Sequence, residues 1–415
     1  MTLRLAAAAL AAAILSACGG TAPTTSQGLV VGVLLPISGA SGALAQEELN
    51  GIRIATDELN RRGGAFGQPV RLEIRDATTR EGFVAAVDSL KGAGAHVVLG
   101  GYESVLSIPA AHAANADGLV YWETGAVADQ LTGEGLPMVF RVGAAGTNLG
   151  SGSAAFAAEQ LAPRLHKAVS DLRVTIVEED DAYGNSVAAA AQAEAAGRGM
   201  QVVDAISYNV VKPDWNAILD RVSASHPDVL VLASYIPDGV AFRRAMLGRH
   251  LQVGALIGST MAECGPIFGQ LLGADAIGVF ASDRPTRGFN PAVLTPAGSA
   301  AYRVLVDSYH SRFSREPGEE AISGFSAAWA LMLDVLPHAT TSSATSISAA
   351  ARAVDLPAGA LPNGGGLKFG TDRPHLGQNL RAASVVWQWQ GVNRSVTVWP
   401  AVFATGEVEM VPLPR

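Results

Sequence analysis

Short runs of apolar residues recur along the chain with mixed segments between them, a pattern typical of strands buried on both faces of a parallel sheet. The clearest runs are 29–35, 96–99, 119–122, 174–177, 229–232 and 276–281. The segments between them have helical spacing; Trp215, Ile218 and Val222, for example, share one face of a predicted helix. This alternation predicts an α/β fold with parallel sheets flanked by helices.

Polar residues predict where several of these helices begin. Asp214 is a good N-cap for the helix that contains Trp215, and Asp238 is expected to cap the following helix. Further helices are predicted near 298–313 and 319–336. The end of the chain differs, because apolar residues alternate with polar ones over 383–403, which predicts a β-hairpin.

The first residues have the pattern of an export signal. An unbroken apolar run over 5–15 is too short to span a bilayer as a helix. It leads into LSAC, which resembles the bacterial lipobox, and this resemblance implies a lipoprotein signal peptide over 1–18 with an acylated Cys18. The alternative is an ordinary signal peptide with an incidental cysteine. Residues 19–28 predict a flexible tether, so an acylated Cys18 would anchor the exported protein to a membrane, facing the periplasm or the cell exterior.

Composition narrows the classes of function. The 29 Lys and Arg against 37 Asp and Glu give a net charge of −8, which argues against a nucleic-acid binder because such proteins need a basic face. With 49% apolar and 16% charged residues, the chain can bury a large core. Cys18 and Cys264 are the two cysteines, too few for a disulfide scaffold, and Cys264 is a lone thiol if Cys18 is acylated.

Catalytic fingerprints are absent from the sequence. No nucleophile elbow, phosphate-binding loop, dinucleotide-binding turn or zinc-protease motif occurs, and no histidine lies three or four residues from another. The carboxylates over 178–181 stay candidates for acid–base chemistry, because they follow a predicted strand and α/β sheets bind ligands at strand carboxyl ends. A hydrolase that uses Glu123 and 178–181 would be the enzymatic alternative, but it lacks a visible nucleophile–base pair. We expect no enzyme activity, no cofactor and no metal.

Several segments, in order, carry a resemblance to a known family. They are VGVLLPISG at 31–39, GGYES at 100–104, TGAVADQLT at 124–132, FRV at 140–142, DDAYGNS at 180–186 and PDVLVLASYIPDGVAFRRA at 227–245. Behind a lipobox, they resemble the substrate-binding proteins of branched-chain amino-acid ABC transporters, which have the type I periplasmic binding fold. The resemblance spans about 29–390, nearly all of the chain that follows the signal.

The resemblance implies two Rossmann-like α/β lobes joined by three crossovers, which close on a ligand like a hinge. We place the crossovers near 144–147, 282–285 and Ser384. The predicted lobes are 28–145 with 285–383 for lobe one, and 146–284 with 384–415 for lobe two. Strand carboxyl ends from both lobes would line the cleft between them.

The resemblance also implies site residues. Ser104 matches the serine that binds the ligand's carboxylate through its hydroxyl and N–H, although a plain N-cap serine is the alternative. Gly125 matches the residue whose carbonyl accepts from the ligand's amino group. Val127 stands where the family usually has Thr, so its N–H remains and the hydroxyl contact is lost. Tyr183 and Tyr235 match two tyrosines of lobe two that cover the ligand; half-buried packing is their alternative.

One departure from the family concerns charge. Thr260 stands where the family commonly has the Glu that pairs with the ligand's ammonium group. Glu123, at the end of a lobe-one strand, would replace that charge, with a cation–π face from Trp122 or Tyr102. The alternative for Glu123 is a solvated rim residue, and Glu263 is a weaker candidate for the missing charge.

The predicted function is therefore a lipid-anchored receptor that captures an amino acid or similar small polar molecule and delivers it to an ABC permease. The alternative keeps the fold and cleft but makes the protein a sensor for an amide, urea-like or aromatic carboxylate ligand, which the loss of the ammonium-pairing Glu favours. The expected partners are the small molecule, the permease subunits and the membrane, with no nucleic acid. The protein itself is expected to be a monomer.

Overall fold

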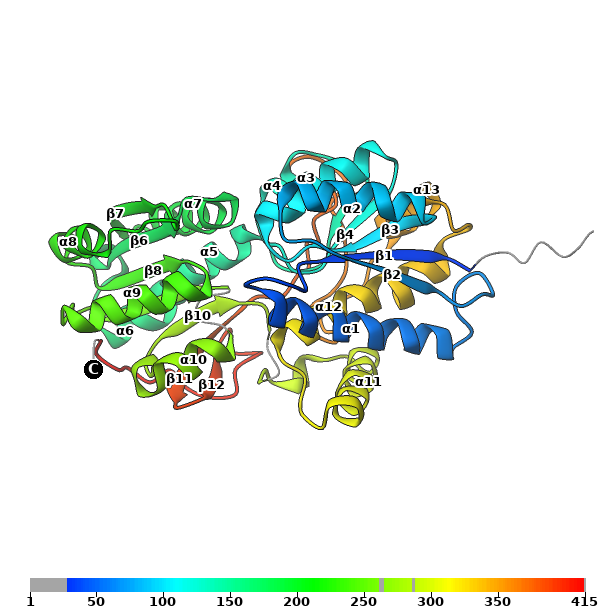
Figure 1. The fold of residues 1–415 in the computed structure, drawn as a ribbon. Coiled ribbons are helices and arrows are strands. Elements are labelled where there is room, and N and C mark those ends of the chain that lie inside the picture. The colour runs from blue at the N-terminus through cyan, green and yellow to red at the C-terminus, as the bar shows by residue number, and fades with distance from the viewer. Residues whose placement is uncertain (1–27, 261–264, 286–287, 414–415) are drawn as a thin grey trace, which may run out of the picture.

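The computed structural model describes residues 28–260, 265–285 and 288–413. Cys18, Glu263 and Cys264, with the predictions made for them, lie outside the described residues. Figure 1 shows two groups of strands side by side, each with helices on both of its faces, and chain segments that pass between them. Within the described part of the chain, no helix is long and apolar enough to cross a bilayer.

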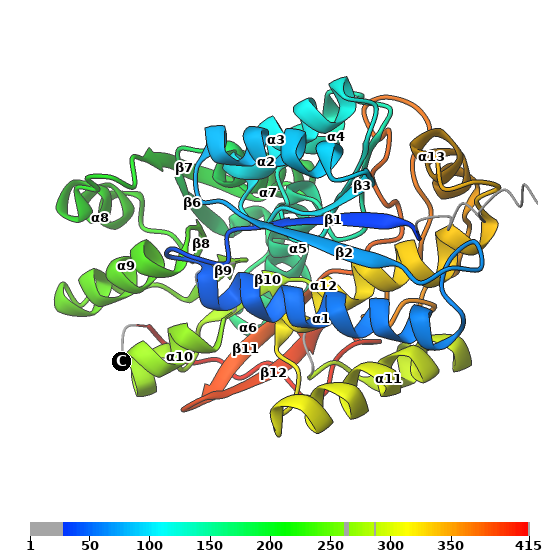
Figure 2. The same cartoon turned by 45° about the vertical axis from the view of Figure 1, so that its right-hand side comes forward.

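The first sheet is parallel, with the strand order β2-β1-β3-β4-β5. Its strands are β1 (Val30–Leu35), β2 (Arg71–Asp76), β3 (Ala95–Gly100), β4 (Val120–Glu123) and β5 (Val139–Arg141). Its helices are α1 (Gly42–Arg61), α2 (Arg80–Gly92), α3 (Ser104–Ala116), α4 (Gln130–Gly133), α11 (Pro296–Phe313), α12 (Glu319–Trp329) and α13 (Ala344–Ala353). Helices α2 and α3 pack on one face, whereas α1, α11, α12 and α13 pack on the other (Figure 2).

The second sheet has the order β12-β11-β10-β9-β8-β6-β7 and is parallel except for its terminal hairpin. Its strands are β6 (Arg173–Glu179), β7 (Gln201–Tyr208), β8 (Val229–Ala233), β9 (Ala255–Ser259), β10 (Phe280–Asp283), β11 (Val385–Gly391) and β12 (Arg394–Trp399). One face packs against α5 (Gly146–Phe156), α6 (Ala162–Arg164) and α7 (Ala182–Gly197). The other packs against α8 (Trp215–Ser225), α9 (Ile236–Gly248) and α10 (Pro266–Leu272).

Short helical segments complete the described chain. Two are π-helical and extend longer helices: η1 (Ala157–Leu161) and η5 (Ala330–Val335). Four are 3-10 turns: η2 (Val169–Asp171), η3 (Gly273–Ala276), η4 (Pro291–Val293) and η6 (Leu336–His338). The helix predicted over 319–336 is therefore regular only as far as Trp329.

The predicted fold class is confirmed, with two sheets that are mostly parallel and flanked by helices. The terminal hairpin is present as β11 and β12, and Asp214 caps α8 by accepting from the N–H of Ala217 at 3.1 Å. Two predicted details are wrong: the start of the strand over 276–281 and the capping role of Asp238. The strand predicted over 276–281 begins only at Phe280, because η3 occupies the chain as far as Ala276.

Asp238 was expected at the start of α9 and instead lies inside its first turn. The helix begins at Ile236, with Tyr235 as N-cap, because Pro237 has the φ angle and the missing N–H that suit the first turn of a helix. Asp238 is buried there and accepts a hydrogen bond from the hydroxyl of Tyr208.

The chain that follows β10 first packs against the second sheet. Phe289 is buried in the same apolar cluster as Trp387, and Val293 packs against that cluster. The chain returns to the first sheet with α11, where Leu305 and Tyr309 are fully buried. The lobe boundary at 285 stays a prediction, and these contacts favour a boundary after Val293.

Candidate functional site

The predicted site residues follow strands of both sheets at their carboxyl ends. Ser104 follows β3, Gly125 and Val127 follow β4, Tyr183 follows β6, Tyr235 follows β8 and Thr260 follows β9. One apolar cluster contains Val127 and Tyr183, and Tyr235 packs against it. Because Val127 belongs to the first α/β unit and the tyrosines to the second, residues of both units meet at one place.

Ser104 is the first residue of α3, and the N-cap position belongs to Glu103. The reading of Ser104 as a plain N-cap is therefore wrong. Its Oγ accepts from the N–H of Ala128 at 3.1 Å, which joins the start of α3 to the loop after β4. The hydroxyl hydrogen and the N–H of Ser104 have no acceptor among the described residues, so both can donate to a ligand.

Gly125 lies where a larger residue would not fit easily. A Cβ at this position would stand 3.1 Å from the Cδ2 of Tyr102 and 3.2 Å from the Oε1 of Glu48. The Tyr102 hydroxyl donates to Glu320 Oε1 at 2.7 Å. Burial, followed by the charge of Glu320, raises the pKa of Tyr102 well above its usual range, so this phenol stays a hydrogen-bond donor.

Glu123 is fully buried, so its reading as a solvated rim residue is wrong. Its Oε1 accepts from the N–H groups of Thr124, Gly125 and Ala126 at 3.0, 2.8 and 2.7 Å. Burial raises the pKa of Glu123, while the N–H groups of Ala126 and Gly125 lower it. This carboxylate shapes the loop after β4 through Oε1, while its Oε2 has no hydrogen-bond partner among the described residues. A contact with the ligand stays a prediction.

The two tyrosines and Thr260 form one polar wall. The Tyr183 hydroxyl donates to the carbonyl oxygen of Thr260 at 2.9 Å, and the Tyr235 hydroxyl donates to Asp181 Oδ2 at 3.0 Å. The two rings are 5.1 Å apart between centroids. The Thr260 hydroxyl donates to Asp283 Oδ1 at 2.5 Å, so its side chain points toward the crossover after β10.

Sequence reasoning missed a buried ionic cluster beside this wall. Arg284 follows β10 and is only 4% exposed. Its Nη2 lies 3.5 Å from Glu319 Oε1 and 3.4 Å from Glu320 Oε2, and its Nη1 lies 2.9 Å from Ser323 Oγ. The signal available in the sequence was a charged pair, Asp283 with Arg284, at a strand end in a predicted crossover.

The carboxylates over 178–181 stand at the end of β6. Burial raises the pKa of Glu178 to about 7 and that of Glu179 to about 8, and neighbouring carboxylates add to both shifts. Asp181 caps α7 by accepting from the N–H of Gly184 at 2.7 Å. Among the described residues, no group of His, Cys, Asp and Glu side chains has an arrangement that could hold a metal ion.

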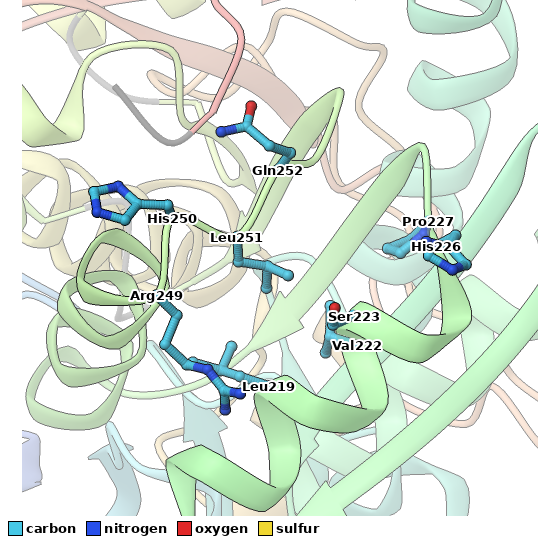
Figure 3. A pocket seen from close by; sticks show the side chains of 9 residues that line it. All are labelled: Leu219, Val222, Ser223, His226, Pro227, Arg249, His250, Leu251 and Gln252. Atoms are coloured by element: carbon cyan, nitrogen blue, oxygen red, sulfur yellow. The ribbon is translucent and has the colours of Figure 1, made fainter.

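A surface cavity of about 320 Å³ lies elsewhere, at the amino ends of β8 and β9. His226 and Pro227 form one side of it, and Arg249, His250 and Gln252 form the other (Figure 3). The cavity is thus at the edge of the second sheet opposite to the predicted site residues. It contains none of them.

Comparisons with known proteins agree with the fold. The family model described as "Periplasmic binding protein" matches residues 28–389. A Leu/Ile/Val-binding protein homolog of Brucella abortus is 30% identical over 374 residues, which cover 89% of this chain and 90% of that protein.

Two solved structures share the fold. A leucine-binding protein from Thermotoga maritima has a TM-score of 0.75 at 18% identity and covers 89% of this chain and 98% of its own. A solute-binding protein of an ABC transporter from R. palustris, solved in complex with benzoate, has a TM-score of 0.72 at 19% identity and covers 92% and 98%. The chain therefore belongs to the periplasmic binding protein family, among the substrate-binding proteins of branched-chain amino-acid ABC transporters.

Proposed function

We propose that this chain captures a small carboxylate-bearing molecule between its two lobes and delivers it to an ABC permease. The observation that carries the proposal is the meeting of Val127 with Tyr183 and Tyr235 at facing strand ends of the two α/β units. A molecule bound there touches both lobes, so its binding energy favours the closed arrangement. The proposed mechanism is hinge closure without a covalent step.

The names of relatives support a carboxylate as the common feature of the ligand. The Brucella relative is named for leucine, isoleucine and valine, and the R. palustris protein was solved with benzoate. These molecules share a carboxylate attached to an apolar body. In this chain the first turn of α3 offers unused N–H groups, and a helix N-terminus favours an anion.

The proposed site assigns the carboxylate to Ser104 and the N–H of Val127, and the apolar body to Tyr183 and Tyr235. Ser104→Ala removes one hydrogen bond and keeps the backbone donors, so affinity falls by about 1–2 kcal/mol, roughly five- to thirtyfold in Kd. A matched control is Ser343→Ala, because Ser343 caps α13 by accepting from the N–H of Ser346. That variant keeps full affinity.

The experiment is native mass spectrometry of gently purified protein, followed by calorimetric titration of the small molecule that it carries. We expect one molecule per chain and a weaker complex for Ser104→Ala only. A carried molecule whose affinity is equal in wild type and Ser104→Ala would remove Ser104 from the site. A chain that binds no small molecule, in any preparation, would contradict the proposal.

We also propose that the mature protein is a monomer anchored to a membrane through an acylated Cys18. The lipobox-like LSAC supports the anchor, and no other stretch of the sequence has the ~18 consecutive apolar residues of a membrane-spanning helix. Cys18→Ala is expected to release the protein from the membrane fraction. A wild-type protein without acyl mass at its N-terminus, together with a Cys18→Ala variant that still sediments with membranes, would refute the anchor.

A further inference from the structure

Three carboxylates and two tyrosine hydroxyls lie together where strands of the second sheet end. Glu179 is the last residue of β6, Asp181 follows it, and Asp238 lies in the first turn of α9. The Tyr235 hydroxyl donates to Asp181 Oδ2 at 3.0 Å, and the hydroxyl of Tyr208, at the end of β7, donates to Asp238. This acidic cluster of Glu179, Asp181 and Asp238 is at the sheet edge where the ligand is proposed to bind.

Two buried oxygens of the acidic cluster have no hydrogen-bond partner among the described residues. They are Oε2 of Glu179, a residue that is 7% exposed, and Oδ1 of Asp238, which is 5% exposed. The charged groups that act on Glu179 are Asp181, Asp238 and Glu103, so no cation of the described chain balances its charge. Buried carboxylates without partners are costly, and a ligand can supply the missing donors and positive charge.

Glu103 brings a fourth carboxylate to this place from the first α/β unit. It is the N-cap residue of α3, directly before Ser104, and its Oε1 accepts from Ser41 Oγ at 2.5 Å. Its charge is one of the causes that raise the pKa of Glu179, so the two carboxylates are within electrostatic range of each other. Like charges on facing units oppose closure where water is excluded, and a cation between them would remove this repulsion.

Tyrosine rings lie beside the acidic cluster. The ring centroids of Tyr183 and Tyr235 are 5.1 Å apart, and the bond from Tyr235 to Asp181 holds the second ring next to a carboxylate. Ring faces attract organic cations and also pack against methylene groups. Since the described acids and histidines have no arrangement that could hold a metal ion, the cation that fits here is organic.

A proton is the other possible source of positive charge in this cluster. Burial, followed by the charges of Asp181 and Asp238, raises the pKa of Glu179 to about 8. At pH 7 the free protein therefore holds a proton on Glu179. A cation bound beside this residue favours its carboxylate form and releases the proton, whereas a neutral group does not.

We infer that the acidic cluster binds an organic cation on the body of the ligand, with Glu179 as its main partner, while Ser104 binds the ligand's carboxylate. Because Ser104 belongs to the first unit and Glu179 to the second, the two charges lie at opposite ends of the ligand. The inference rests on the proposed function, since it concerns the same cleft. It narrows the ligand to a carboxylate whose body ends in an ammonium or guanidinium group.

The test uses three pairs of compounds that differ in the terminal cation: lysine with norleucine, arginine with citrulline, and 5-aminopentanoate with pentanoate. Calorimetric titration of the wild-type protein at pH 7 measures all six dissociation constants. In at least one pair we expect the cationic compound to bind, and wherever it binds, to bind about tenfold or more tighter than its neutral partner. A neutral partner that binds as tightly as the cationic compound would overturn the inference, and so would a failure of all three cationic compounds to bind.

Proton release identifies the group that meets the cation. The same titrations in phosphate and in Tris, which differ in ionisation enthalpy, count the protons released on binding. We expect the cationic compound to release about one proton per chain more than its neutral partner, because Glu179 gives up its proton. Equal proton release by both members of a pair would contradict the assignment of the cation to Glu179.

Glu179→Gln removes the charge and keeps the size of the side chain. The preference for the cationic compound should then shrink to about threefold or less. Glu194→Gln is a matched control, because it removes the same charge from α7 at an ion pair with Arg198 of 2.6 Å, and it should keep the full preference. A preference that persists in Glu179→Gln would remove this residue from specificity, and if that variant does not fold, the wild-type ratios and proton counts decide.

Small-angle scattering separates this inference from the proposed function. If a neutral compound binds most tightly and shrinks the radius of gyration, the inference fails and the receptor function stands. If the bound compound leaves the radius of gyration unchanged, hinge closure fails whatever the charge of the ligand.

Discussion

At the residue scale, the buried carboxylates of Glu123 and Glu320 bind other groups of the protein itself. Glu123 holds the loop after β4 through three N–H groups, and Glu320 holds Arg284 and Tyr102. The loop and Arg284 in turn fix the Gly125 carbonyl. Site geometry therefore depends on groups that need not touch a ligand.

Removal of the Glu123 carboxylate should destabilise the fold. In Glu123→Ala, three buried N–H groups lose their acceptor, so the free energy of unfolding falls by about 3 kcal/mol. Glu123→Gln keeps one oxygen and should cost about 1 kcal/mol. Urea denaturation measures both. Unchanged stability in Glu123→Ala together with a large loss of ligand affinity would instead place Glu123 in the ligand contact.

The position of a single residue could be predicted where the residue directly follows a recognisable strand. Ser104, Tyr183 and Tyr235 each follow a strand, and their positions can be counted from the apolar runs. Arg284 could not be placed in this way. Its partners Glu319 and Glu320 lie 35 and 36 residues further along the chain, on α12, and only the return of the chain to the first sheet brings them to β10.

At the element scale, the turn from β3 into α3 depends on Gly101. Its φ is +81°, and an added Cβ would lie 2.0 Å from Ser107 Oγ and 2.5 Å from Glu123 Oε2. Gly94 has a similar φ of +86° with nothing within 4 Å of an added Cβ. Alanine variants at the two glycines therefore separate the cost of backbone strain from the cost of a steric clash.

Gly94→Ala should lower the free energy of unfolding by about 1–2 kcal/mol, the cost of left-handed backbone in an alanine. Gly101→Ala adds a clash in a closed space and should cost about 3–5 kcal/mol. Thermal or urea unfolding compares them. Equal losses in the two variants would show that the space around Gly101 relaxes freely.

The carboxyl end of β6 should make stability depend on pH. Burial raises the pKa of Glu178 to about 7 and of Glu179 to about 8, from an ordinary 4.5. The folded state then binds protons that the unfolded state has released, so the unfolding free energy falls as pH rises between about 4.5 and about 8.

Urea denaturation at a series of pH values should show this loss, and Glu179→Gln should flatten it. The control Glu407→Gln should leave it unchanged, because the Glu407 side chain is 96% exposed. A stability that rises through the same pH interval would contradict the assignment of raised pKa values to these two carboxylates.

The strands could be predicted from the sequence pattern, but some boundaries of strands and helices could not. The apolar runs predicted the strands because each buried strand has apolar residues on both faces. The pattern could not mark the start of β10, since Ala276 and Val279 are buried just as strand residues would be, while Ala276 still belongs to η3. Asp238 was misassigned as a cap because its contact, the hydroxyl of Tyr208 on β7, is tertiary.

At the scale of the whole molecule, the two α/β units are joined where the ligand is proposed to bind. Arg284, at the end of β10, contacts α12 and the loop after β4. At a second place, the N–H of Asp129 in the first unit donates to Ser186 Oγ on α7 of the second unit at 3.0 Å. These contacts join the two units, as a closed arrangement requires. A ligand that adds contacts to both units would increase its population.

The central claim is that a small molecule bound between the units holds them closed. Small-angle X-ray scattering tests it most directly, on protein freed of the small molecule that it carries and then saturated with that molecule again. The account predicts one bound molecule per chain and a smaller radius of gyration on binding. Stoichiometric binding with an unchanged radius of gyration would contradict it.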